Sequence, residues 1–216
     1  MAESLPFAVL ISGRGSNMLA LARAAQAGSI AGHIVAVVSE RADAPGLAAA
    51  AGLGLPARVL APEPAEDRAG YGRRLDAVLA AAGARLVALA GFMRILDAGF
   101  VRAWQGRVLN IHPSLLPAYR GLHTHRRVLE AGERLHGCTV HFVSEELDAG
   151  PAVIQGRVPV LPRDDERSLS ARVQRLEHII YPRAVGWFAA GRLAWRDGAA
   201  WLDGSRMAGP VIEESS

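Results

Sequence analysis

The sequence contains no lysine and only one cysteine, so all 24 of its Lys and Arg positions are arginine. Without lysine, Schiff-base catalysis, pyridoxal phosphate attachment and the lysine of a P-loop are excluded. The lone Cys138 excludes an internal disulfide and thiolate-rich metal sites, and we expect it to be a small buried strand residue. No apolar run approaches the roughly 18 residues of a membrane span, and the N-terminus shows no secretory signal. We therefore expect a cytoplasmic protein without a membrane partner.

Charge of one sign does not dominate either, because 24 basic residues face 21 acidic ones and the formal net charge is only +3. The arginines form no long basic run, so the composition does not indicate a nucleic-acid partner. The chain of 216 residues is long enough to bury a substantial core in one domain.

Short apolar runs alternate with helix-periodic segments in the first half of the chain. The runs are β-branched and almost continuous, as in strands that are buried on both faces, and they cover residues 7–11, 34–38, 86–90 and 108–111. Between them we predict helices at 16–27, 43–52 and 66–82. This alternation predicts an α/β fold with one doubly wound, mostly parallel sheet whose N-terminal half is Rossmann-like. Ligands of such sheets bind at the carboxyl ends of the strands.

The pattern changes after residue 110. A turn-rich stretch and a helix near 122–132 precede two strand-like segments, residues 139–143 and 152–160, which we predict to be antiparallel neighbours. A long amphipathic helix follows, and we expect Pro182 to kink or interrupt it. The domain is predicted to span residues 1–204, and residues 205–216 are predicted to be a polar, poorly ordered tail.

A glycine-rich turn is the first candidate site. The first predicted strand runs into Ser12-Gly-Arg-Gly-Ser-Asn17 and then directly into a helix. Glycines allow a tight turn, and the free N–H groups of a helix N-terminus attract phosphate. Met18 occupies the place of the third glycine in a dinucleotide fingerprint, which weakens an oxidoreductase interpretation. The structural alternative is an ordinary turn capped by Ser16 or Asn17.

Two further candidate sites lie later in the chain. Asn110 and His112 are two residues apart at the end of a predicted strand, so both side chains project to the same face. An amide N–H and a protonated imidazole both stabilise a developing oxyanion. An acidic loop at residues 144–150 contains Asp148, whose carboxylate would favour the imidazolium form of His112 if the two met. The alternatives are a strand-end histidine bonded to a turn and an aspartate that satisfies its own turn.

The order of these motifs resembles the phosphoribosylglycinamide formyltransferase family, which is folate-dependent. The resemblance rests on Ser12–Asn17, Ala90-Gly-Phe-Met-Arg-Ile-Leu96, Asn110-Ile-His-Pro-Ser-Leu-Leu-Pro117, Gly121-Leu-His-Thr-His125, His141-Phe-Val143, Glu146-Leu-Asp148, Val173-Gln-Arg-Leu-Glu-His178 and Ala200-Trp-Leu-Asp-Gly204. It covers nearly the whole chain. It implies transfer of a formyl group from 10-formyltetrahydrofolate, a co-substrate, to the amine of 5-phosphoribosylglycinamide in purine synthesis, without a metal.

The resemblance also implies roles for individual residues. Asn110, His112 and Asp148 would be catalytic, while Gly15, Ser16, Asn17 and Glu177 would bind the phosphoribosyl substrate. Arg68, Met93, Arg94, Ile95 and Leu96 would bind the folate together with Asn110. The domain would then divide into a phosphate-binding half, about residues 1–105, and a catalytic and folate-binding half, about 106–204. Partners would be these small molecules, and the protein would be a monomer or homodimer. Arg14 and the stretch Ala118–Arg120 depart from the family pattern.

Other enzyme classes are less consistent with the sequence. A metal hydrolase would draw on His112, His123, His125, His136 and His141, but their spacing matches no zinc-protease motif. A serine hydrolase would use Ser114, and no Gly-x-Ser-x-Gly elbow is present. A formyltetrahydrofolate deformylase and a methionyl-tRNA formyltransferase share the Asn/His/Asp set, but we expect an additional N-terminal or C-terminal domain in each. A binding module without turnover is the remaining class.

Overall fold

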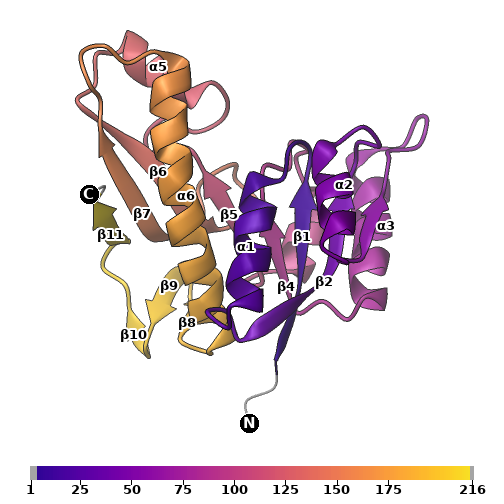
Figure 1. Cartoon of the computed structure of the whole chain (residues 1–216). Coiled ribbons are helices and arrows are strands. Elements are labelled where there is room, and N and C mark those ends of the chain that lie inside the picture. Colours follow the sequence, from indigo (N-terminus) through magenta and orange to yellow (C-terminus); the bar gives the residue numbers. More distant parts are fainter. Residues whose placement is uncertain (1–3, 215–216) are drawn as a thin grey trace.

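The computed structural model describes residues 4–214. Its centre is an eight-stranded sheet with the strand order β11-β7-β6-β5-β4-β1-β2-β3 (Figure 1). These strands are β1 (Leu5–Ile11), β2 (Gly32–Ser39), β3 (Ala57–Val59), β4 (Leu86–Leu89), β5 (Val108–His112), β6 (Leu135–Phe142), β7 (Ala152–Pro159) and β11 (Val211–Glu214). The strands from β3 to β5 pair in parallel, whereas β6 is antiparallel to both of its neighbours and β11 is parallel to β7.

Helices cover both faces of this sheet. They are α1 (Ser16–Gln26), α2 (Pro45–Gly52), α3 (Arg68–Ala81), α4 (Ala98–Ala103), α5 (Thr124–Glu130) and α6 (Glu166–Ala189). Successive side chains of β1 alternate between the faces, as a strand requires. Phe7, Val9 and Ile11 pack with residues of α1 and α6, whereas Ala8 and Leu10 pack with residues of α3 and α4. The predicted doubly wound α/β fold is confirmed.

The structure contains elements that the sequence pattern did not predict. The short β3 and α4 were missed, and so was a small antiparallel sheet of β8 (Leu193–Arg196), β9 (Ala199–Leu202) and β10 (Ser205–Arg206). The expected polar tail from residue 205 is wrong for its described part, because β11 pairs with β7 and Val211 packs against the core. Residues 215–216 of that tail lie outside the described residues. The strand is only four residues long and includes two glutamates, so its sequence gives little periodic signal.

The long helix α6 holds the two halves of the sheet together. It begins with a capping box, in which Asp165 accepts a bond from Ser168 N–H and the Ser168 side chain accepts one from Asp165 N–H. It continues through Pro182 to Ala189, so the predicted interruption is wrong. The buried Tyr181 hydroxyl lies 3.0 and 2.9 Å from the carbonyl oxygens of Leu89 and Leu109, at the adjacent strands β4 and β5.

No helix within residues 4–214 is long and apolar enough to span a bilayer. Cys138 is fully buried in β6, as predicted, and burial raises the pKa of its thiol.

Candidate active site

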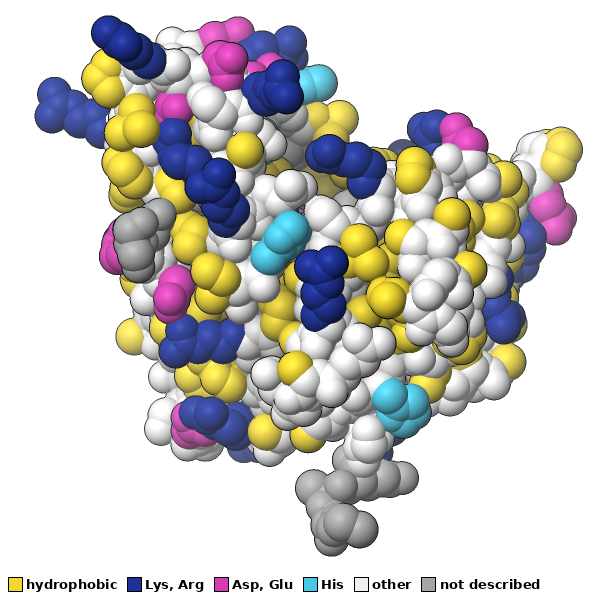
Figure 2. Space-filling model, viewed as in Figure 1, with side chains coloured by type: hydrophobic (Ala, Val, Ile, Leu, Met, Phe, Trp, Pro, Cys, Tyr) yellow, Lys and Arg dark blue, Asp and Glu magenta, His cyan; other side chains and the backbone are white. Residues whose placement is uncertain are grey.

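The surface is hollowed between the part of the molecule that carries α5 and the part that carries α1 and α2 (Figure 2). In the parallel part of the sheet, β1 and β5 both run toward this hollow (Figure 1). The carboxyl ends of these strands carry Ser12 and His112, so the segments predicted to be functional lie on the edge where α/β proteins bind ligands.

Asn110 and His112 lie on the same face of β5, as predicted. The neighbouring strand places a polar side chain opposite each of them, because β5 pairs with β6 in the register Asn110↔His141 and His112↔Thr139. Residues that face each other across an antiparallel pair lie on the same side of the sheet. The sheet therefore carries a block of four polar side chains at this position.

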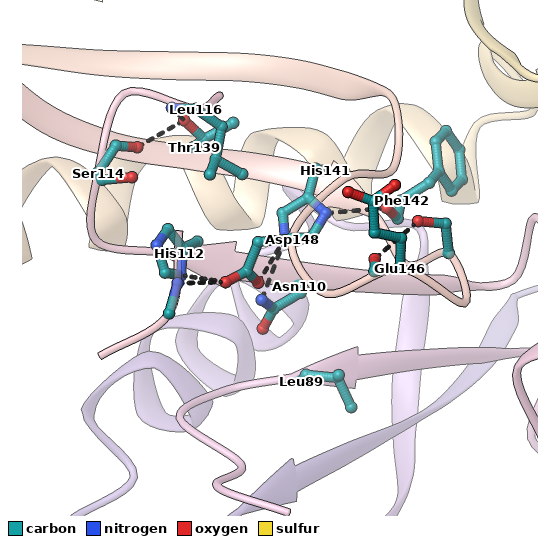
Figure 3. Close-up of polar contacts among 12 residues, drawn as sticks. Leu89, Asn110, His112, Ser114, Leu116, Thr139, His141, Phe142, Glu146 and Asp148 are labelled. Atoms are coloured by element: carbon teal, nitrogen blue, oxygen red, sulfur yellow. Dashed lines mark hydrogen bonds and ion pairs between the residues drawn. The ribbon is translucent and has the colours of Figure 1, made fainter. Parts of the chain in front are cut away.

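Both nitrogens of the His112 ring face protein groups (Figure 3). Nε2 is 3.1 Å from the carbonyl oxygen of Tyr119, and because a carbonyl only accepts, Nε2 carries the proton. Nδ1 is 3.4 Å from Asp148 Oδ2. The carboxylate is placed to accept from Nδ1 whenever this nitrogen also carries a proton. The two side chains are only 8% and 7% exposed, so water screens their attraction weakly.

Backbone geometry holds Asp148 against the ring. The residue has a left-handed φ of 51°, a conformation that aspartate adopts more readily than most residues. Gly121 N–H donates to Oδ2 at 3.0 Å. Gly150 is needed next to it, since a Cβ at this position would lie 1.9 Å from the Phe142 carbonyl oxygen. The structure thus brings Asp148 to His112 from a loop 36 residues further along the chain, counting 148 − 112.

His141 is a member of this cluster that sequence reasoning did not assign. Its Nδ1 is 2.9 Å from the Phe142 carbonyl oxygen and so carries the proton, which leaves Nε2 to accept from Asn110 Nδ2 at 3.1 Å. Burial lowers the pKa of His141 to about 4, so the ring is neutral at pH 7. Its Nε2 is also 3.7 Å from Asp148 Oδ1. His141 therefore orients the Asn110 amide. The sequence marked it as part of the motif His141-Phe-Val143 but gave no role for its side chain.

The glycine-rich turn forms a second group at the end of β1. Gly15 is the N-cap of α1, has a φ of 73° and provides no side-chain cap, so the structural alternative of a turn capped by Ser16 or Asn17 is wrong. The first backbone bond of the helix runs from Leu19 N–H to Gly15 C=O, and the N–H groups of residues 16–18 have no acceptor within the helix. Such a turn is suited to an anion.

Glu177 and Gln174 on α6 reach this turn. Asn17 Nδ2 donates to Glu177 Oε2 at 2.8 Å, and Gln174 Nε2 donates to Ser16 Oγ at 3.1 Å. Burial raises the pKa of Glu177, while the bond from Asn17 opposes this shift. The structure therefore brings together Ser16, Asn17 and Glu177, to which the resemblance assigns substrate binding. Gln174 was not predicted, although it lies one helical turn before Glu177 on the same face.

The residues expected to bind folate lie on the face of the sheet that α3 and α4 cover. Arg68 begins α3 and is exposed. Met93 and Ile95, in the loop after β4, are 67% and 52% exposed, while Leu96 packs against the same core cluster as Val143, the residue before the acidic loop. Ser12 Oγ accepts from Met93 N–H at 2.7 Å and fixes the start of this loop.

Arg94 lies in the same loop, with its guanidinium 4.4 Å from the centre of the Tyr71 ring. Burial of Tyr71 raises the pKa of its hydroxyl to about 12.

The histidines considered for a metal site are not arranged as metal ligands within the described residues. His125 and His136 pair with each other, with Nδ1 and Nε2 at 2.9 Å, and burial lowers the pKa of both rings, that of His136 to about 4. Within residues 4–214 no three His, Cys, Asp or Glu side chains form a cluster of the kind that holds a metal.

Comparison with known proteins connects these motifs to one chemistry. The model of the formyl transferase family matches residues 5–185. The phosphoribosylglycinamide formyltransferase of Escherichia coli is 49% identical over 199 residues, covering 92% of this chain and 94% of that protein. A trifunctional purine biosynthetic protein of Drosophila melanogaster is 47% identical over 186 residues, or 85% of this chain, but the match spans only 14% of that larger protein. A solved phosphoribosylglycinamide formyltransferase of Coxiella burnetii superposes with a TM-score of 0.92 at 45% identity, covering 97% of this chain and 100% of that one.

The chain belongs to the formyl transferase family. The resemblance stated from the sequence is confirmed, and so is the prediction of an enzyme that transfers a formyl group in purine biosynthesis. The metal-hydrolase, serine-hydrolase and binding-module interpretations are set aside by this match. Formyl transfer needs groups that stabilise a tetrahedral oxyanion and move a proton. Asn110, His112 and Asp148 have these properties, and they are adjacent.

Proposed function

We propose that the protein transfers the formyl group of 10-formyltetrahydrofolate directly to the amine of 5-phosphoribosylglycinamide. The neutral amine attacks the formyl carbon, and a tetrahedral centre with a negative oxygen forms. The bond from this carbon to N10 of the folate then breaks. The attacking nitrogen loses a proton and N10 gains one, so no acyl-enzyme and no metal are required.

The observation that carries this proposal is the juxtaposition of His112 and Asp148 beside Asn110 (Figure 3). The Nδ1–Oδ2 separation of 3.4 Å is longer than a charge-assisted hydrogen bond, so the Nδ1 proton is available to an oxygen that approaches between them. Asn110 has a second amide hydrogen beyond the one directed at His141, and we assign it to the same oxygen. Loss of one such donor raises a barrier by about 2.7–4 kcal/mol.

Asp148 has two roles in this scheme. Its carboxylate faces His112 Nδ1 and orients the ring, and its oxygens are placed to hold a water that carries the proton from the attacking amine to N10. A buried, preorganised carboxylate does this without rearrangement, because Gly121 N–H and His112 already orient it.

The phosphoribosyl substrate is proposed to bind at the turn after β1. Gly15 allows the turn, the free N–H groups of Ser16 and Asn17 receive the phosphate, and Glu177 accepts hydroxyl bonds from the ribose. The N-terminal half, about residues 1–105, then supplies most of the phosphate site, although Glu177 comes from the C-terminal half. Holding two reactants in one orientation contributes about 7–11 kcal/mol to such reactions.

The folate is proposed to bind across the loop after β4. Grouped exposed apolar side chains mark ligand-binding surfaces, and Met93, Ile95 and Leu147 are exposed on the loop after β4 and on the loop that carries Asp148. A flat pteridine ring fits this apolar surface, and Arg68 and Arg94 supply positive charge for the carboxylates of its tail. Leu96 anchors the loop to the core.

A two-substrate assay tests the proposal. Purified protein is incubated with 10-formyltetrahydrofolate, with and without 5-phosphoribosylglycinamide, and formation of tetrahydrofolate is followed. We expect turnover only when the glycinamide is present, and its loss in Asn110→Ala, His112→Ala and Asp148→Asn. Turnover without the glycinamide would instead identify a deformylase, and full activity of the three variants would overturn the assignment of the catalytic set.

The remaining properties are proposed on the same basis. We expect the enzyme to act in the cytoplasm on these two small molecules, without nucleic acid, membrane or metal, as a monomer or homodimer. Sedimentation across a range of protein concentrations distinguishes the two oligomeric states, and activity that survives dialysis against a chelator tests the absence of a metal requirement.

A further inference from the structure

A row of polar side chains crosses three strands next to the catalytic cluster. The register of β5 with β6 places Thr139 opposite His112, and the register of β6 with β7 places Gln155 opposite Thr139. Thr139 is fully buried and Gln155 is 5% exposed, in a strand where Val153 and Ile154 are fully buried. A buried amide in an apolar strand is costly unless it is hydrogen-bonded, so its bonds indicate what it does.

The Thr139 hydroxyl makes every bond that it is able to make. It lies 2.6 Å from the Ser114 carbonyl oxygen, which only accepts, so its single proton goes there. Its oxygen accepts from Leu116 N–H at 3.1 Å and from Gln155 Nε2 at 3.1 Å. The hydroxyl thus fixes two backbone groups of the segment that leaves β5 (Figure 3).

Gln155, on the next strand β7, is hydrogen-bonded to the same segment. Its Nε2 donates to the Leu116 carbonyl oxygen at 2.8 Å as well as to Thr139 Oγ1, which uses both amide hydrogens. Within the segment, Ser114 Oγ donates to the Ala118 carbonyl oxygen at 2.7 Å. Every second residue of the segment is therefore held: Ser114 and Leu116 by buried bonds, and Ala118 by a partly buried one.

The next residue after this segment carries the group that contacts His112. Tyr119 C=O is the acceptor of the Nε2 proton of His112, and two residues later Gly121 N–H donates to Asp148. Tyr119 has a left-handed φ of 55°, a conformation that a non-glycine residue adopts only when its surroundings hold it there. The bonds from Thr139 and Gln155 are the buried part of those surroundings.

We propose that Gln155 is a positioning residue for formyl transfer, which acts with Thr139 to hold residues 114–118 so that the Tyr119 carbonyl fixes the orientation of His112. The proposal rests on the catalytic role assigned to His112 above. Gln155 touches neither substrate in this scheme. It sets the position of a backbone oxygen that would otherwise move with an exposed turn, and it does so from a strand that carries none of the predicted site residues.

Kinetics of Gln155→Leu test this role. Leucine has a similar size but no hydrogen-bonding groups, so the Leu116 carbonyl loses its bond from Gln155 and the Thr139 hydroxyl loses one of its two donors. We expect kcat to fall by about 10- to 100-fold, the effect of small misplacements at a reacting centre. The KM values for both substrates should stay near those of the original protein. The matched control is Ile154→Val, on the same strand but facing the apolar core, which should leave kcat unchanged.

A second pair of variants keeps the test informative if Gln155→Leu folds poorly. Thr139→Val removes the hydroxyl at constant shape, and Thr139→Ser restores it. We expect Thr139→Val to lose kcat as Gln155→Leu does and Thr139→Ser to recover most of the loss. A purely structural role would lower thermal stability in both cases without separating kcat from KM.

NMR of the protein labelled with ¹⁵N-histidine reads the orientation of His112 without activity. We expect the Nε2–H signal of His112 to shift or broaden in Gln155→Leu and to be unchanged in Ile154→Val. An unchanged signal with unchanged kcat would overturn the inference. Because Asn110→Ala, His112→Ala and Asp148→Asn test the catalytic set directly, loss of activity in those three with full activity in Gln155→Leu would reject the positioning role alone.

Discussion

The turn at Gly15–Asn17 and the cluster around His112 lie on the same edge of the sheet but are built in different ways. The turn consists of neighbours in the chain, and two side-chain bonds, Asn17 to Glu177 and Gln174 to Ser16, connect it to α6. The cluster depends on β5, β6, the loop that carries Asp148 and the turn that carries Tyr119. A site of the first kind survives wherever its local sequence is kept, whereas a site of the second kind requires the whole sheet to be in register.

The two regions also differ in the groups that they bury. Burial at the turn raises the pKa of a carboxyl, Glu177, and burial near the cluster lowers the pKa of imidazoles, His136 and His141. In both regions burial therefore favours the neutral form of a titratable side chain: Glu177 at the turn, and His136 and His141 near the cluster. The folded state is consequently stabilised in opposite pH ranges by the two regions.

The largest expected effect removes the charge at the cluster. Asp148→Asn keeps the shape and the Gly121 bond but removes the negative charge that faces His112 Nδ1 and the proton-accepting oxygen, so we expect kcat to fall by about 10²–10⁴-fold. The KM for 5-phosphoribosylglycinamide should change little, because the turn is untouched. Glu145→Gln is the control, since Glu145 lies in the same loop and its ion pair is with the exposed Arg102. More than a tenth of the original kcat in Asp148→Asn would contradict its role.

The difference between a turn built from neighbouring residues and a cluster built across strands explains which site residues the sequence predicted. The turn at Ser12–Asn17 was found because a strand, two glycines and a helix are adjacent in the sequence. Asn110 and His112 were found because a spacing of two on a strand fixes a common face. Asp148 was found from an acidic loop and a family resemblance, and no local pattern gave its contact with His112.

The missed groups depend on register or on the backbone. The pairing of His141 with Asn110 follows from the alignment of β5 with β6, which the periodicity of either strand leaves open. Tyr119 contributes a carbonyl, and every residue has one, so no residue type marks it. Ser12 and Gln174 lie inside motifs that were found, but they received no role, because a serine in a turn and a glutamine on a helix are usually solvated.

The next expected effect compares the two regions through pH. The pKa of His136 is about 4 in the folded protein, against an ordinary value of 6.5 that we take for the unfolded chain. Between these two pH values the unfolded chain therefore binds more protons than the folded protein. The contribution of His136 to stability is therefore present above pH 6.5 and is lost as the pH falls toward 4, by roughly 3 kcal/mol at most. We expect urea unfolding to show a steep loss over this range.

The comparison of variants isolates this contribution. His136→Gln should flatten the pH dependence of the free energy of unfolding between pH 6.5 and 4. His33→Gln, at an exposed histidine in β2, should leave the shape of the curve as it was. An equal slope in His136→Gln and the original protein would show that the buried imidazole pair is not what makes acid destabilising.

A smaller effect of the opposite sign is expected at the turn. Burial raises the pKa of Glu177, so its contribution is present below about pH 4.5 and is lost as the pH rises through the higher, folded value. Asn17→Ala removes the bond that opposes this shift. We expect the variant to lose about 1–3 kcal/mol of stability at neutral pH and less at pH 4.

Binding separates the structural and functional parts of that loss. Asn17→Ala should also raise the KM for 5-phosphoribosylglycinamide. The double variant Asn17→Ala/Glu177→Gln removes the buried carboxylate, so it should recover stability without recovering the KM. Recovery of both would mean that the pair serves the fold alone.

The smallest expected effect tests whether the cluster depends on its exposed contacts. Arg120 forms an ion pair with Glu146 and so joins the turn of Tyr119 and Gly121 to the loop of Asp148, but the two side chains are 39% and 74% exposed. Exposed pairs contribute about 0–1 kcal/mol, so Arg120→Ala and Glu146→Ala should each lower kcat by less than about fivefold. In a double-mutant cycle the coupling between them should shrink as salt is added, because the Debye length falls to about 3 Å at 1 M. A loss above tenfold that persists in high salt would mean that the exposed pair, rather than the buried bonds of Thr139 and Gln155, holds the Tyr119 carbonyl and the Gly121 N–H against His112 and Asp148. In that case contacts between exposed loops, and not the register of the sheet, would hold the cluster around His112 in place.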